Sequence, residues 1–379
     1  MTHRRLAPIA AAITFLVALA ACGSSSSKSA SPTTQNTRSG LPAYEGVGPY
    51  AVGYTTLHMT DRDVVVWYPA APGAYVGKAK ATYDQRSPLP ANLKGLVPDK
   101  YNTVITMNAY TDAAASPKGP FPLVMLSHGA GGYSLVNSAL GVGLASWGYV
   151  VTSTDYFERG LRASLPGSPK YARDPGRDTL HMLATIDVTK AATDDPKSVL
   201  HGLVDFDHIG AVGHSAGGGT AFNALRDPRV DVAVGWAPVA PSGTPANKPT
   251  MIIGARGDSA LTPTVLAATY ASFPSPKRYV TIEAGGHNSF SDVCPVIKSG
   301  GGLIQFAIAN HLVNPKLAQL GFNGCNANDI DAAKFWPIVQ HFTVAELRSV
   351  FGQDPTPVGL GAGITEAFAP VGITYLHSP

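Results

Sequence analysis

The feature that most constrains the fold is the pentapeptide Gly213-His214-Ser215-Ala216-Gly217, which stands between an apolar run and a segment of small residues. The apolar run Ile209–Val212 predicts a buried strand, and the segment from Gly217 onward predicts a helix. Glycines on both sides of a serine permit a turn too tight for other side chains, with the hydroxyl exposed at its tip. The pattern therefore indicates a nucleophilic serine. The alternative is a glycine-rich turn whose serine is structural.

Short apolar runs alternate with longer helix-like segments along most of the chain, and several of the runs lack polar alternation. Such runs are typical of strands covered by helices on both faces, so the pattern predicts an α/β fold with a mostly parallel, doubly wound sheet. Two early strands without a helix between them, Tyr50–Leu57 and Val64–Tyr68, predict an antiparallel start. The further expected strands are Leu123–Ser127, Tyr149–Thr154, Ile209–Gly213, Val232–Trp236, Thr250–Gly254 and Tyr279–Glu283. The expected helices are Leu135–Ser146, Asp178–Thr193, Gly217–Arg226, Thr264–Phe273, Gly302–His311 and Ala332–Gln340.

A serine hydroxyl needs a base to become a nucleophile, and the base needs a group that orients it. After this type of turn the expected chain order is serine, acid, histidine. Asp258 follows the expected strand Thr250–Gly254, and His287 follows the next one. Both therefore fall at the carboxyl edge of the sheet, where open α/β sheets place their sites. We predict the catalytic set Ser215, Asp258 and His287, with Asp292 or Glu283 as substitute acids.

A second small-residue turn, Ser127-His128-Gly129-Ala130-Gly131-Gly132, follows the strand Leu123–Leu126. A turn in this place can aim backbone N–H groups at a developing oxyanion. We expect the N–H groups of Ala130 and Ala216 to be these donors, although a plain tight turn would have the same composition. His128 is interpreted as a packed residue that supports the turn rather than as a base.

These motifs resemble those of the α/β-hydrolase fold. Ser127-His128-Gly129, Gly213-His214-Ser215-x-Gly217-Gly218 and His287-x-x-Phe290-x-Asp292 look like the platelet-activating-factor acetylhydrolase-like and predicted dienelactone hydrolase branch, and so does Val66-Trp67-Tyr68-Pro69. The loop Gly254–Asp258 with Pro263, and Trp236 before it, are similar to bacterial cutinase-like polyester hydrolases. The resemblance covers about Gly48 to His311. True dienelactone hydrolases have a cysteine where this chain has Ser215.

The resemblance implies hydrolysis of a carboxylic ester through an acyl-enzyme, without a metal or cofactor. Trp236 falls where cutinase-like enzymes place an aromatic residue against the substrate; a tryptophan half-buried at a strand end is the other interpretation. Only thirteen residues separate Trp236 from Thr250, too few for a helical cap domain, so we expect no large cap and an open site.

Other functions remain compatible with these motifs. They are an acyltransferase on the same fold, a cutinase- or lipase-like polyester hydrolase, a peptidase, and a non-catalytic envelope lipoprotein. The intact nucleophile, acid, base and oxyanion turn count against the last of these.

The N-terminus predicts export. Arg4 and Arg5 precede an apolar run, Leu6–Ala21, that is too short and too early for a structural membrane span. The run ends in Ala21-Cys22-Gly23, which looks like a lipobox with cleavage before Cys22 and a lipid on its sulfur; an ordinary secretory signal is the alternative. We therefore expect a signal peptide over residues 1–21, a flexible Ser/Thr-rich tether over residues 22–40, and attachment to a membrane through the lipid of a bacterial envelope protein.

The charge and the cysteines indicate which partners and which compartment to expect. Formal net charge is +3, and the first forty residues contribute four basic and no acidic side chains, which leaves no basic surface for nucleic acid. If Cys22 carries lipid, Cys294 and Cys325 remain, and in an oxidising compartment they predict one disulfide; two buried thiols are the alternative.

We expect the catalytic domain to span residues 41–342 and to be followed by an extension, residues 343–379, of unassigned role.

Overall fold

The computed structural model describes residues 43–89, 91–164, 174–299, 302–311 and 315–379 of the 379-residue chain. Cys22, the expected signal peptide and the expected tether lie outside the described residues. In the part that is described, no helix is both long and apolar enough to cross a membrane.

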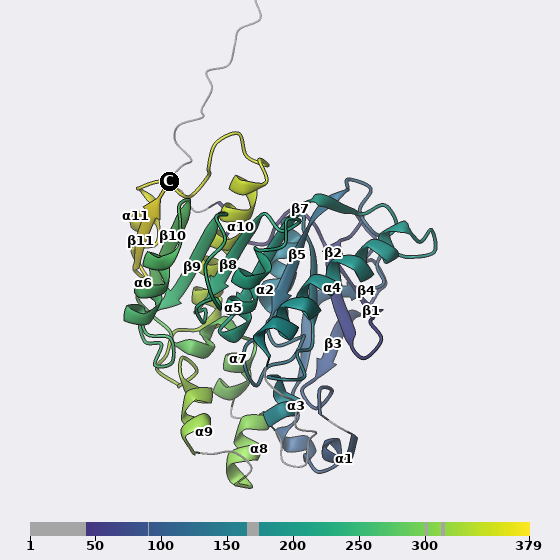
Figure 1. Ribbon diagram of the computed structural model, residues 1–379. Coiled ribbons are helices and arrows are strands. Elements are labelled where there is room, and N and C mark those ends of the chain that lie inside the picture. Colours follow the sequence, from purple (N-terminus) through teal and green to yellow (C-terminus); the bar gives the residue numbers. More distant parts are fainter. Residues whose placement is uncertain (1–42, 90, 165–173, 300–301, 312–314) are drawn as a thin grey trace, which may run out of the picture. The chain divides into compact units, whose positions relative to one another are not determined.

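The described residues contain a single eleven-stranded sheet with the order β11-β10-β9-β8-β7-β5-β6-β2-β1-β4-β3 (Figure 1). Its centre and one side are parallel: β6, β5, β7, β8, β9 and β10 run in the same direction. The parallel strands are β5 (Phe121–Ser127), β6 (Val150–Thr154), β7 (Val204–His214), β8 (Val232–Trp236), β9 (Thr250–Ala255) and β10 (Lys277–Ile282). Strands β5, β6, β8 and β9 are buried along their whole length, which explains the lack of charged residues in them and the mostly apolar sequences of β5, β8 and β9.

The early strands pair in the antiparallel manner that the sequence predicts. β1 (Val52–His58) pairs with β2 (Asp63–Pro69), and β2 also runs antiparallel to β6. Two strands that the sequence analysis did not identify, β3 (Lys80–Asp84) and β4 (Val104–Thr111), complete this side. Their burial alternates or is low, because they lie at the edge of the sheet.

Helices cover both faces of the sheet. On one face lie α4 (Pro175–Asp194), α5 (Ala216–Ala224) and α6 (Pro263–Ser272), which Figure 1 shows in front of the strands. On the other face, α2 (Ser138–Ser146) and α10 (Ala332–Val350) pack against each other and against the strands. Each face has its own apolar core, so the parallel strands are enclosed on both sides. The fold is therefore the predicted doubly wound α/β arrangement.

The shorter helices lie in the connections. They are α1 (Ala91–Lys94), α3 (Leu161–Ser164), α7 (Val293–Lys298), α8 (Leu303–Ala309), α9 (Pro315–Phe322) and α11 (Ile364–Ala367), with 3-10 turns at Asp99–Tyr101 and His287–Phe290. Residues 237–249, where a cap domain would be inserted, form a loop without helix or strand.

The C-terminal residues 343–379, which the sequence analysis set apart as an extension, take part in this fold. The expected boundary after residue 342 lies inside α10, whose buried side chains continue to Leu347. The last strand, β11 (Ile373–Ser378), pairs antiparallel with β10 along its whole length. It covers an edge that would otherwise expose unpaired backbone groups.

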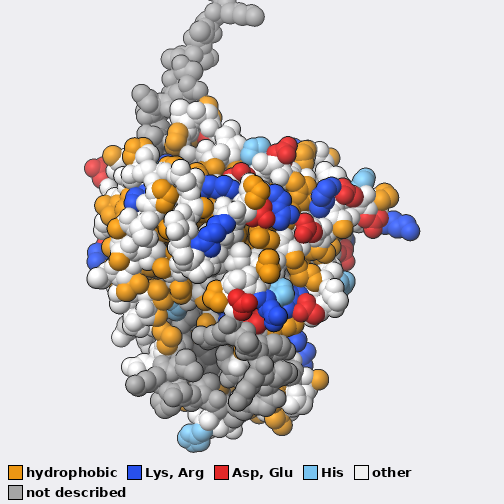
Figure 2. All heavy atoms as spheres, in the orientation of Figure 1, with side chains coloured by type: hydrophobic (Ala, Val, Ile, Leu, Met, Phe, Trp, Pro, Cys, Tyr) orange, Lys and Arg blue, Asp and Glu red, His pale blue; other side chains and the backbone are white. Residues whose placement is uncertain are grey.

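Charged side chains of both signs lie next to one another on the face seen in Figure 2. A buried ion pair joins α10 to the sheet: Arg278 Nη1 of β10 lies 2.5 Å from Glu346 Oε2 of α10. Glu346 is fully buried and Arg278 is 8% exposed. Burial raises the pKa of Glu346 to about 7, and the neighbouring guanidinium opposes this rise.

We predict that Arg278→Met lowers the free energy of unfolding by about 3 kcal/mol, because it leaves a buried carboxyl group without its cation. Urea unfolding followed by circular dichroism measures the loss. The double variant Arg278→Met/Glu346→Leu should recover at least half of it, since an apolar pair of similar volume needs no charge compensation. A single variant as stable as the wild type would contradict the prediction.

Candidate active site

Ser215 lies in a strained turn between β7 and α5. Its backbone has φ 56° and ψ −120°, a conformation that residues with side chains seldom adopt. A Cβ at Gly213 would collide with the carbonyl of Gly217, and one at Gly217 would collide with the carbonyl of Ser127. The glycines of the pentapeptide are therefore required by the close approach of strand, helix and neighbouring loop. The turn is held by hydrogen bonds from Ser215 N to Trp236 O (2.9 Å) and from Val239 N to Ser215 O (2.9 Å).

The structure brings the three predicted side chains together. His287 Nε2 lies 3.0 Å from Ser215 Oγ, and His287 Nδ1 lies 2.8 Å from Asp258 Oδ2. Asp258 follows β9 and His287 begins the 3-10 turn after β10, so both stand at the carboxyl edge of neighbouring parallel strands. All three residues are less than 9% exposed. Asp258 is oriented by its other oxygen, Oδ1, which accepts hydrogen bonds from Ala260 N and Leu261 N (both 2.8 Å).

Neither substitute acid contacts His287 in this arrangement. Glu283 forms two 2.8 Å contacts with the guanidinium of Arg256 at the surface. Asp292 accepts hydrogen bonds from Ser138 Oγ at the start of α2 and from Tyr83 Oη (3.2 Å). The carboxylate beside the imidazole is that of Asp258.

The two proposed oxyanion donors lie beside the serine. Ala216 is the first residue of α5, and the first N–H groups of a helix have no acceptor within it. The turn that carries Ala130 approaches so closely that a Cβ on Gly129 would lie 3.0 Å from Ser215 Cβ. Ala130 and Ala216 both line a cavity of about 210 Å³ that runs along α5 between Gly219, Asn223 and Val239. The two residues therefore lie at one end of a shared cavity, next to the serine.

His128 supports this turn, as the sequence analysis interprets it. It is buried, its Nδ1 donates to Gly129 O (2.8 Å), and its Nε2 accepts from Tyr156 N (3.2 Å). Burial lowers the pKa of His128 to about 3, so the ring is neutral at neutral pH. A neutral ring with both nitrogens hydrogen-bonded has no role as a base.

Trp236 is not exposed at the site, which corrects the expectation that it lies against the substrate. The indole is fully buried at the end of β8, and its Nε1 donates to Thr343 Oγ1 of α10 (3.0 Å). Side chains alternate between the faces of a strand, and Trp236 points into the core beneath the sheet. The exposed apolar residue near the site is Val239, three positions further on.

The sequence analysis did not assign a role to two residues of the site. His214, the variable position of the pentapeptide, is buried against His287 and donates from Nε2 to its carbonyl oxygen (2.8 Å). Asn323 joins both loops: its Oδ1 accepts from His287 N (2.7 Å) and its Nδ2 donates to Gly257 O (2.9 Å). His214 could have been suspected from its place beside Ser215, whereas nothing in the local sequence distinguishes Asn323.

The disulfide Cys294–Cys325 is present, as predicted. It closes a loop of about thirty residues. Cys325 stands two positions after Asn323, so the disulfide limits how far the Asn323 amide can move from the loops that carry Asp258 and His287. In the chain-entropy account a closed loop of this length stabilises the fold by roughly 3–4 kcal/mol.

A larger cavity, about 780 Å³, lies elsewhere, between β1, β4 and α2; Ser215, Asp258 and His287 line neither this cavity nor the one along α5. Among the residues that the structure describes, no group of three or more His, Cys, Asp or Glu side chains could hold a metal ion.

Asp292 supplies a prediction about pH. Burial raises its pKa to about 6, and hydrogen bonds from Ser138, Ala139 N and Tyr83 oppose the rise. The folded state therefore holds a proton that the unfolded state has lost between about pH 4 and pH 6, so this group makes the free energy of unfolding decrease as pH rises through that window, by about 3 kcal/mol at most.

We predict that Asp292→Asn removes this contribution. The difference in unfolding free energy between variant and wild type, measured by urea unfolding at several pH values, should shift in favour of the variant from pH 4 to pH 6. Other carboxyl groups contribute equally to both proteins. A difference that stays constant with pH would contradict the assignment.

Comparisons with known proteins agree with this geometry. The family model described as PET hydrolase-like matches residues 130–300, which include Ser215, Asp258 and His287. The model of platelet-activating factor acetylhydrolase, isoform II, matches residues 83–165, which include the turn with Ala130. A solved ferulic acid esterase from Streptomyces cinnamoneus shares the fold, with a TM-score of 0.61 and 23% sequence identity over 89% of this chain and 99% of that chain.

A search of curated proteins gave no match. The shared fold and the two family matches support a carboxylic ester hydrolase with the α/β-hydrolase fold, similar to PET hydrolase-like enzymes and to platelet-activating factor acetylhydrolase.

Proposed function

We propose that the chain is an exported serine esterase that acts through Ser215, His287 and Asp258 and passes through an acyl-enzyme. The observation that carries the proposal is the continuous hydrogen-bonded series Asp258–His287–Ser215 beside the N–H groups of Ala130 and Ala216. Nucleophile, base, orienting acid and oxyanion donors are the parts that ester hydrolysis by a serine requires.

The proposed reaction begins with attack of Ser215 Oγ on the ester carbonyl carbon while His287 Nε2 takes the hydroxyl proton. The carbonyl oxygen becomes negative and is stabilised by the N–H groups of Ala130 and Ala216. His287 then gives its proton to the leaving alcohol, and the acyl group stays on Ser215. Water, deprotonated by His287, releases the acid by the same steps. Asp258 keeps the proton of the neutral ring on Nδ1 and stabilises the imidazolium.

The cavity beside the oxyanion donors supports small acyl groups as substrates. A long fatty acyl chain would extend beyond this cavity of about 210 Å³. The PET hydrolase-like match favours a second candidate, hydrolysis of a polyester whose repeating acyl units are short and whose chain lies across an open site. Residues 237–249 form a loop without a cap domain, and a site without a cap suits such a bulky substrate.

We also propose that the protein acts outside the cytoplasm and is held at a membrane by a lipid on Cys22. The basic residues and apolar run before Cys22 support the signal, and the Ser/Thr-rich stretch after it supports a tether. The disulfide supports an oxidising compartment. Radiolabelled palmitate incorporation, with Cys22→Ala as the control, tests the anchor.

We predict that the full-length protein hydrolyses p-nitrophenyl acetate and butyrate at least about tenfold faster, in kcat/KM, than p-nitrophenyl palmitate. Ser215→Ala should lower the rate by at least about a thousandfold, because no other nucleophile is placed beside His287. Ser259→Ala, an exposed serine in the loop after Asp258, is the matched control and should keep the wild-type rate.

A palmitate optimum would contradict the small acyl group, and films of an aromatic polyester would then be the next substrate to test. Full activity in Ser215→Ala would contradict the mechanism. A folded wild-type protein inactive on the whole series would contradict esterase action on simple esters.

Asn323→Ala should lower kcat by about tenfold with little change in KM, because the loops that carry Asp258 and His287 lose their shared amide. The matched control is Asn326→Ala, on the other side of Cys325. The side chain of Asn326 donates a hydrogen bond to Asp329, within its own turn. Steady-state kinetics on p-nitrophenyl acetate measure both. Equal kcat in the two variants would show that Asn323 does not position the site.

A further inference from the structure

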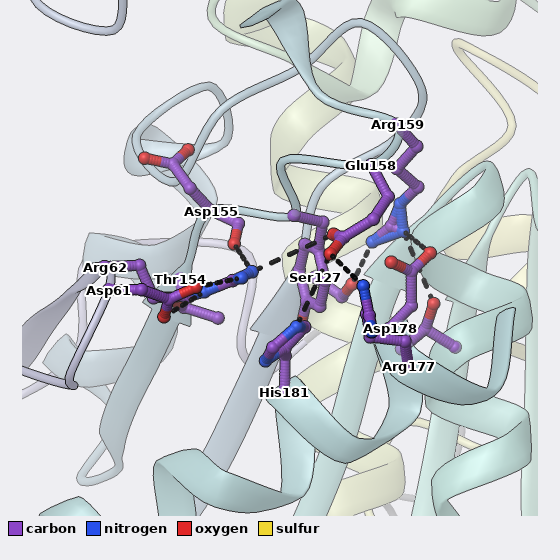
Figure 3. Close-up of polar contacts among 12 residues, drawn as sticks. Asp61, Arg62, Ser127, Thr154, Asp155, Glu158, Arg159, Arg177, Asp178 and His181 are labelled. Atoms are coloured by element: carbon purple, nitrogen blue, oxygen red, sulfur yellow. Dashed lines mark hydrogen bonds and ion pairs between the residues drawn. The ribbon is translucent and has the colours of Figure 1, made fainter. Parts of the chain in front are cut away.

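Behind the oxyanion turn lies a cluster of buried charged and polar side chains, drawn in Figure 3. Most of it belongs to residues 154–159, which begin with the last residue of β6, and to the first turns of α4. Glu158 is 4% exposed and faces Arg62 and Arg177 at 3.9 Å and His181 at 3.6 Å. Arg159, the next residue, points the other way, toward Ser127, Asp178 and Thr220.

Arg159 is 4% exposed, and a guanidinium at that depth is costly unless its N–H groups are used. Its Nη1 donates to Asp178 Oδ2 (3.1 Å) and to Thr220 Oγ1 (3.4 Å), and its Nη2 donates to Ser127 Oγ (2.8 Å). The group also lies over the ring of Tyr156, 4.0 Å from its centre. These three acceptors come from α4, α5 and β5, so one planar group joins three elements of the site.

The contacts of Arg159 enclose Ala130, the first proposed oxyanion donor. Ser127, which the guanidinium holds, is the last residue of β5 and precedes the turn. Gly131, directly after Ala130, donates its backbone N–H to the carbonyl oxygen of Arg159 (2.7 Å). The turn is therefore held by the same residue on both sides of Ala130.

The same side chain reaches the second donor through α5. Thr220 accepts a hydrogen bond from Arg159 and donates its own hydroxyl to Ala216 O (3.2 Å). Ala216 and Thr220 form the first turn of α5, the helix whose N-terminus faces the serine. Hydrogen bonds thus connect Arg159 to Ala216 through Thr220, and to Gly131, the residue next to Ala130.

We propose that Arg159 is a positioning residue that sets the separation of the Ala130 and Ala216 N–H groups, and so the affinity of the site for a negatively charged oxygen. This inference rests on the proposed serine esterase function. Asp178, held in α4, fixes the guanidinium in the required orientation.

The chain offers a matched control in Arg348. Its guanidinium also pairs with an aspartate, Asp354 (2.7 Å), and lies over a tyrosine ring, that of Tyr44 (5.3 Å). It stands on α10, and its contacts involve neither the oxyanion turn nor α5. Arg159→Met and Arg348→Met each remove an ion pair and a contact with a tyrosine ring. Only Arg159→Met also removes hydrogen bonds to the oxyanion turn and to α5.

The experiment compares the full-length wild type with Arg159→Met, Thr220→Val and Arg348→Met, all checked for folding by circular dichroism. The first readout is kcat and KM on p-nitrophenyl acetate. The second is the rate at which a fluorophosphonate labels Ser215, because its phosphoryl oxygen needs the same two N–H groups but no ester turnover. Arg159→Met should lower kcat and the labelling rate by at least about tenfold and change KM by less than about threefold.

Thr220→Val should lower both rates by a smaller factor, and Arg348→Met should leave both within about twofold of the wild type. Wild-type rates in folded Arg159→Met would overturn the inference. If Arg159→Met does not fold, wild-type rates in Thr220→Val would overturn it. Failure of the proposed function is distinguishable, because the wild type itself would then neither hydrolyse the esters nor be labelled at Ser215.

Discussion

The rest of the site depends on the backbone of Ser215, which is held with a positive φ between a buried parallel strand and a helix. A serine in that conformation costs of order 1–3 kcal/mol, so its neighbours must hold it. Strand β7 lies between β5 and β8 at the centre of the sheet, and Trp236 O, at the end of β8, accepts the serine N–H. The strain directs the hydroxyl out of the carboxyl edge, toward the imidazole of His287, whose loop follows β10, three strands away.

Parallel pairing explains why the partners meet there. Strands β7, β8, β9 and β10 are neighbours in one direction, so the residues that follow them share an edge although 72 positions separate Ser215 from His287. The sequence contains this information in its alternation of apolar runs and helices. For that reason Asp258 and His287 could be placed beside Ser215 before any coordinates were known.

What could not be predicted depends on contacts between distant segments. Asn323 joins the acid and histidine loops from a segment without a motif, and Arg159 joins the oxyanion turn to α4 and α5. The side to which Trp236 points depends on the register of β8, which puts it under α10 instead of at the surface. The sequence analysis did not predict β11, because residues 343–372 before it are rich in glycine and proline. The burial of Ile373–Ser378 nevertheless alternates, as is typical of an edge strand.

The chemistry of the strained serine depends on loops that the disulfide and the side chains of Asn323 and Arg159 hold in place. The most direct test of this account is mass spectrometry of the protein quenched with acid during turnover of p-nitrophenyl acetate. The account predicts one acetyl group, located on the peptide that contains Ser215, and its disappearance once substrate is exhausted. Turnover without an acyl-enzyme, or an acetyl group that accumulates on another residue, would contradict it.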